Sequence, residues 1–123
     1  MARVLIIDDD KMFRHLLKRW LNLAGHDVEE AETGKEGMNK CHVMRPDVVI
    51  TDIFMPDADG IEMTLDAVQS QCARGIIVIS GGGRTIDGLH FLDYAKRFGA
   101  FAAFQKPLER EKLLQAVDAI MAE

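Results

Sequence analysis

The chain has 123 residues, 48% of them hydrophobic, and a formal net charge of −5 at pH 7. This length and apolar content predict one folded domain and exclude intrinsic disorder. The acidic balance argues against nucleic acid as the main partner, because phosphate backbones are bound by basic surfaces. The apolar stretch at 4–7 is too short for a signal peptide, and no stretch reaches membrane-spanning length, so no membrane partner is expected.

The two cysteines, Cys41 and Cys72, are too few for a disulfide framework. Neither stands in a CxxC motif or in a spacing that would bind a metal. Both are expected to be small, buried or half-buried residues of helices. A reducing, cytoplasmic setting therefore fits the sequence best.

Five short apolar segments recur along the chain, beginning near residues 4, 28, 48, 76 and 101. The first, third and fourth are continuous and rich in Val and Ile, which is typical of strands buried on both faces. The second and fifth, 28–31 and 101–104, are mixed and are expected to form edge strands.

Helices are predicted in the gaps, over about 11–24, 35–44, 61–71 and 85–98, with a fifth after Pro107. On the first helix the predicted core face carries Phe13, Leu16, Leu17, Trp20 and Ala24. Its predicted solvent face carries Lys11, Arg14, Lys18 and Arg19. The alternation of strand and helix predicts an α/β fold with a doubly wound, five-stranded parallel sheet. Two edge and three central strands favour the strand order 2-1-3-4-5.

Polar side chains follow four of the predicted strands where ligands bind in such sheets, at the carboxyl ends. The first strand ends in Asp8-Asp9-Asp10, the third in Asp52, the fourth in Ser80, and the fifth in Lys106. Asp10 directly precedes the first helix and is expected to be its N-cap.

Three carboxylates at one sheet edge need a counter-charge, since two of them about 4 Å apart repel by roughly 4 kcal/mol at an effective dielectric near 20. Asp8, Asp9 and Asp52 carry three negative charges together, and Lys106 offsets one. A divalent cation would supply the rest, and carboxylates without His or Cys favour Mg²⁺ over Zn²⁺. A carboxylate beside a metal-held phosphoryl group is a candidate nucleophile.

These residues carry a resemblance. The run V-L-I-I-D-D-D at 4–10, the run D-I-F-M-P-D-A-D-G at 52–60 and the pair Lys106-Pro107 resemble the receiver domain of two-component response regulators. The resemblance covers the whole chain and implies the flavodoxin-like receiver fold, with 1–123 as a single phosphoacceptor domain and no output domain.

The resemblance also implies roles for single residues. Asp52 would accept a phosphoryl group from a sensor histidine kinase or histidine phosphotransferase. Asp9 would bind Mg²⁺ directly, Asp8 mostly through water, and the backbone carbonyl of Phe54 would be a further ligand. Ser80 and Lys106 would contact the phosphoryl group. The Lys106–Pro107 peptide bond is expected to be cis.

The resemblance to receiver domains implies that the chain is a regulatory phosphoacceptor, which catalyses its own phosphotransfer and dephosphorylation, rather than a metabolic enzyme. It would change its affinity for an unknown output protein, and phosphorylation could also drive dimerisation. Ala103 departs from the family, which usually has an aromatic residue there. An alternative reading is a phosphohydrolase with an aspartyl-phosphate intermediate, because such enzymes favour D-x-D after the first strand and Asp8-x-Asp10 fits that pattern.

Overall fold

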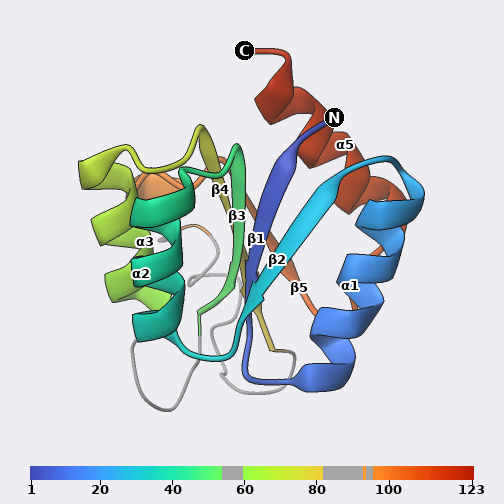
Figure 1. Cartoon of the computed structure of the whole chain (residues 1–123), viewed down its shortest axis with the longest axis horizontal. Coiled ribbons are helices and arrows are strands. Elements are labelled where there is room, and N and C mark those ends of the chain that lie inside the picture. Colours follow the sequence, from blue (N-terminus) through green and yellow to red (C-terminus); the bar gives the residue numbers. More distant parts are fainter. Residues whose placement is uncertain (54–59, 82–92, 94–95) are drawn as a thin grey trace.

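The computed structural model describes residues 1–53, 60–81, 93 and 96–123. Strands and helices alternate through these residues (Figure 1). The strands are β1 (Arg3–Ile7), β2 (Asp27–Ala31), β3 (Val48–Asp52), β4 (Gly75–Ser80) and β5 (Ala102–Gln105). The helices are α1 (Lys11–Leu23), α2 (Gly34–Met44), α3 (Gly60–Ser70) and α5 (Arg110–Met121). The predicted helix over 85–98 falls largely outside the described residues.

The strands form a five-stranded sheet in the order β2-β1-β3-β4-β5, with every neighbouring pair parallel. This confirms the predicted α/β class and strand order. Every residue of β3 and β4 is buried, whereas β2 alternates between exposed and half-buried positions before the buried Ala31. The sequence distinguishes the central from the edge strands because a strand covered on both faces is a nearly continuous apolar run, with polar residues only at its carboxyl end in β3 and β4.

Helices cover both faces of the sheet (Figure 1). α1 and α5 lie on one face and pack residues such as Leu17, Leu21 and Leu113 against β1, β3 and β4. α2 and α3 lie on the other face, where Cys41 and Ala67 join a second apolar cluster. α2 approaches β1 closely because Gly37 has no side chain, and a Cβ there would collide with Ile7. None of the described helices is both long and apolar enough to cross a bilayer.

α1 begins and ends as the sequence predicts. The Asp10 carboxylate accepts hydrogen bonds from the Met12 and Phe13 amides, which confirms its N-cap role. Gly25 follows the helix with φ +92°, a conformation that L side chains rarely adopt.

The predicted faces of α1 are partly wrong. The buried residues are Arg14, Leu17 and Leu21, while Leu16 is 43% exposed. Arg14 was expected on the solvent face, yet only 5% of its surface is exposed. It lies three residues before Leu17 and seven before Leu21, so helical geometry places it on the same buried stripe.

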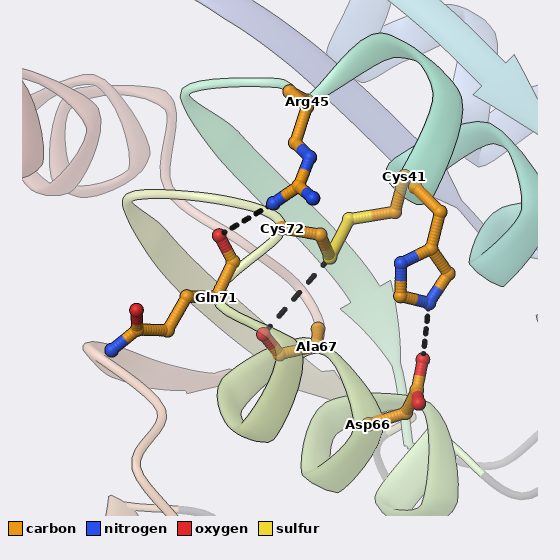
Figure 2. The surroundings of a disulfide bond; sticks show 7 residues. Cys41, Arg45, Asp66, Ala67, Gln71 and Cys72 are labelled. Carbon is orange, nitrogen blue, oxygen red and sulfur yellow. Dashed lines mark hydrogen bonds and ion pairs between the residues drawn. A yellow bond between two sulfur atoms is a disulfide. The ribbon is translucent and has the colours of Figure 1, made fainter.

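Cys41 and Cys72 form a disulfide bond, which the sequence analysis did not anticipate (Figure 2). The bond joins α2 to the segment that follows α3, and it connects residues 31 positions apart with a Cα–Cα distance of 5.9 Å. Both cysteines are buried in the apolar cluster beneath α2 and α3, as predicted, but Cys72 lies two residues beyond α3 and not in a helix. Arg45 Nη1 donates a hydrogen bond to the Gln71 carbonyl oxygen beside the disulfide and also connects the two helix ends (Figure 2).

Candidate functional site

Three carboxylates meet at the carboxyl edge of the sheet. Asp8 and Asp9 follow β1, and Asp52 is the last residue of its neighbour β3. One carboxylate oxygen from each residue lies within 4.8 Å of the others. Asp8 and Asp52 are buried and Asp9 is exposed, so the cluster has one side open to solvent. The predicted convergence of the three acids is therefore present in the fold.

Lys106 reaches this cluster from the end of β5. Its ammonium nitrogen lies 3.3 Å from Asp8 Oδ2 and 3.5 Å from Asp52 Oδ2. The peptide bond between Lys106 and Pro107 is cis, as predicted. The same nitrogen lies 4.0 Å from the centre of the Phe13 ring on α1. The lysine is thus held between two carboxylates and the face of an aromatic ring, a contact the sequence analysis did not anticipate.

The electrostatics of Asp8 reflect its burial. Desolvation is the main cause that raises the pKa of Asp8 to about 6, and the nearby charge of Asp52 adds to it. A hydrogen bond from the Asp10 amide to Asp8 Oδ1, and the charge of Lys106, oppose this shift. Asp8 Oδ2 lies 3.3 Å from the Lys106 ammonium nitrogen and forms an ion pair with it. This oxygen accepts no well-aligned hydrogen bond from the described residues.

Ser80 ends β4, beside the β3 strand that carries Asp52. It is fully buried, and its hydroxyl has no hydrogen-bond partner within the part of the chain that the structure describes. An unpartnered buried hydroxyl is unusual in a folded protein, and a role at a functional site is one explanation for it. Phe54, whose carbonyl was predicted to be a metal ligand, lies outside the described residues.

Arg14, on α1, contacts the backbone of the acidic cluster through its guanidinium group. Its Nη1 donates a 2.6 Å hydrogen bond to the backbone carbonyl of Asp8. Its Nε donates to Glu30 on β2 at 3.1 Å, and its Nη2 lies 3.7 Å from Glu32. The sequence analysis missed this residue, although its helical spacing from Leu17 and Leu21 was available as a signal.

Comparison with known proteins agrees with this geometry. The family model described as the response regulator receiver domain matches residues 4–118. Protein PilH of Pseudomonas aeruginosa is 34% identical over 126 residues, which cover 99% of each chain. Response regulator MprA of Mycolicibacterium vanbaalenii is 31% identical, and the aligned region covers 98% of this chain and 50% of that protein. Among solved structures, chemotaxis protein CheY4 of Vibrio cholerae shares 30% identity and a TM-score of 0.80, with 98% of each chain covered.

Proposed function

Because the chain belongs to the family of response regulator receiver domains, we propose that Asp52 accepts a phosphoryl group in a magnesium-dependent reaction. The donor would be a sensor histidine kinase or a histidine phosphotransferase, and the acceptor would then change its affinity for a protein partner. The observation that carries the proposal is the cluster of Asp8, Asp9 and Asp52, with Lys106 lying between Asp8 and Asp52.

The donor set suits a hard divalent cation. It consists of carboxylates alone, it is partly open to solvent, and one buried oxygen, Asp8 Oδ2, receives no aligned hydrogen bond from the described residues. Asp8, Asp9 and Asp52 would hold Mg²⁺, and the backbone carbonyl of Phe54 is proposed as a further ligand. When bound, Mg²⁺ would offset the carboxylate charges and those of a phosphoryl group.

The residues around Asp52 suit an in-line phosphoryl transfer. An Asp52 oxygen would attack phosphorus and form the O–P bond, while the N–P bond to the donor histidine breaks and its electron pair stays on the imidazole nitrogen. Lys106 would pair with the negative oxygens of the transferred group, since it already lies 3.5 Å from Asp52 Oδ2. The Ser80 hydroxyl would donate a hydrogen bond to one of these oxygens.

Labelling with a small phosphodonor tests the assignment of Asp52. Asp52→Asn should abolish incorporation from acetyl phosphate and Mg²⁺, because an amide is not a nucleophile at this position. Asp10→Asn should retain it, since Asp10 is the N-cap of α1 and asparagine serves equally well there. Stoichiometric labelling that survives Asp52→Asn would overturn the assignment.

The phosphohydrolase alternative requires Asp8 and Asp10 to act together at the end of β1. The Asp10 carboxylate is instead engaged by the Met12 and Phe13 amides, which favours Asp52 as the acceptor. Turnover of a generic phosphate monoester would distinguish the two functions. A receiver domain should release phosphate only from its own aspartyl phosphate, whereas a phosphohydrolase should turn over the ester repeatedly.

A further inference from the structure

We propose that the forked side chain of Arg14 is a positioning residue for the metal site, because it clamps the peptide between Asp8 and Asp9 to strand β2. This inference rests on the proposed function, since it concerns the same magnesium site. It goes beyond that function by assigning a role to a residue that lies outside the acidic cluster.

The geometry of the clamp is specific. The Asp8 carbonyl belongs to the peptide bond that joins two of the proposed ligands, and Arg14 Nη1 donates to it at 2.6 Å. The other side of the guanidinium is fixed by Glu30 at 3.1 Å and lies near Glu32 at 3.7 Å. The side chain is 6% exposed, so the clamp is largely shielded from water.

The chemistry of the clamp depends on arginine. A planar guanidinium presents several donors in a fixed fork and can hold the Asp8 carbonyl and the Glu30 carboxylate at once. Glu30 also pairs with Lys18 at 3.4 Å, which helps to hold the acceptor in place. Groups that orient metal ligands in this way typically contribute about 10- to 100-fold to metal affinity.

The charge of Arg14 and its proposed positioning role predict opposite changes in Mg²⁺ affinity when Arg14 is replaced by a neutral residue. Removing a positive charge near the three acids should, by charge alone, tighten the binding of a cation. Losing the clamp should weaken it, because the Asp8–Asp9 peptide is no longer held in the orientation that aims both carboxylates at one ion. The sign of the change therefore separates the two roles.

The test is a titration of the unphosphorylated protein with MgCl₂ at constant ionic strength, followed by ¹H–¹⁵N NMR. Arg14→Met should raise the Kd for Mg²⁺ by about tenfold or more. Arg14→Lys keeps the charge but has no fork, and it should also bind Mg²⁺ more weakly than the wild type. In the metal-free variants the Asp9 ¹⁵N signal should move, because its nitrogen shares the peptide bond with the Asp8 carbonyl.

Arg19→Met is the matched control, since Arg19 lies on the same helix, is exposed, and loses the same charge. Its Kd should stay within about twofold of the wild type. The inference is overturned if Arg14→Met binds Mg²⁺ as tightly as the wild type or more tightly, or if Arg19→Met weakens binding equally. If Arg14→Met does not fold, unchanged affinity in Arg14→Lys overturns it. A wild-type protein that binds no Mg²⁺ would instead refute the proposed metal site.

Discussion

Asp8 is expected to destabilise the metal-free fold at neutral pH, because its charge is buried and lies near that of Asp52. Its pKa in the folded state, about 6, lies above the ordinary value of 3.8, so the folded protein binds this proton more tightly than the unfolded chain does. The contribution of Asp8 to stability must then fall as the pH rises from about 4 to about 6, and the full cost is present above that range.

Asp8→Asn should therefore stabilise the metal-free protein at pH 7.5, by up to about 3 kcal/mol. Asparagine can still accept the hydrogen bond that the Asp10 amide donates to Asp8 Oδ1. The measurement is urea unfolding in EDTA at pH 4 and pH 7.5, with Asp10→Asn as a control that should change little. A variant less stable than the wild type at pH 7.5 would contradict the assignment.

Phe13 should stabilise the position of Lys106 through a cation–π contact, because the ammonium nitrogen lies 4.0 Å from the ring centre. Phe13→Leu keeps an apolar side chain but removes the π face, and it should slow labelling of Asp52 by about 2- to 10-fold, in line with a cation–π contact of about 0.5–1 kcal/mol or more. Phe13→Tyr keeps the ring and should label at nearly the wild-type rate.

The independent measurement is the NMR shift of the Lys106 ε-methylene protons, which a ring current displaces. The displacement should persist in Phe13→Tyr and disappear in Phe13→Leu. Equal shifts in both variants would mean that the ring does not lie against the lysine in solution.

The residues of the site differ in how far the sequence could predict them. Asp8, Asp9, Asp52, Ser80 and Lys106 were predictable because each ends a strand or lies within two residues of its end, and parallel strands bring their carboxyl ends to one edge. Arg14 and Phe13 act through side chains that cross from α1 to other elements. Their partners, Glu30 and Lys106, are far away in the sequence, so only the packed fold reveals these contacts.

At the scale of elements, the sequence predicted the strands and their order well because burial on both faces leaves a clear apolar pattern. The pairing of Cys41 with Cys72 was not predictable from spacing. It depends on α2 and α3 packing side by side, which brings the two Cα atoms to 5.9 Å. Neither the apolar periodicity nor the number of cysteines specifies that distance.

The disulfide between α2 and the segment after α3 should stabilise the domain. It closes a loop between residues 31 positions apart, and the chain-entropy model gives about 3–4 kcal/mol for a loop of this size. Reduction with dithiothreitol should therefore lower the free energy of unfolding by that order, measured by urea unfolding with and without the reductant.

A Cys41→Ala/Cys72→Ala variant is the matched control, since it keeps small apolar side chains in the same buried cluster. Its stability should resemble that of the reduced wild type and should not respond to dithiothreitol. Equal stability of the oxidised and reduced wild-type proteins would show that the crosslink contributes nothing to the fold.

At the scale of the whole molecule, the fold separates the crosslink from the candidate site. α2 and α3 each run toward the amino ends of the strands that follow them, β3 and β4, and the disulfide joins α2 to the segment after α3 near those ends. The acidic cluster lies at the carboxyl ends of β1 and β3. The disulfide therefore lies away from the acidic cluster, and its reduction should leave Asp52 as the residue that incorporates the phosphoryl label, as proposed above.

The conformational response to a phosphoryl group at the candidate site would also involve the whole molecule. Ser80 can respond, because its buried hydroxyl has no hydrogen-bond partner among the described residues and a phosphoryl oxygen would provide one. Ala103, half-buried on β5 opposite Val78, cannot respond by turning an aromatic ring, since it has only a methyl group. We therefore expect the response to run from Ser80 into the Gly81-Gly82-Gly83 run and the residues that follow it.

Amide hydrogen exchange with and without beryllofluoride, a stable phosphoryl mimic, tests this route. Changes in protection should centre on residues 80–90, and the amides of β5 around Ala103 should change little. Ala103→Tyr supplies the ring that Ala103 lacks, and it should extend the change in protection into β5. A strong response of β5 in the wild type, with residues 80–90 unchanged, would contradict the route, because the signal would then pass through β5 although Ala103 has no ring to turn.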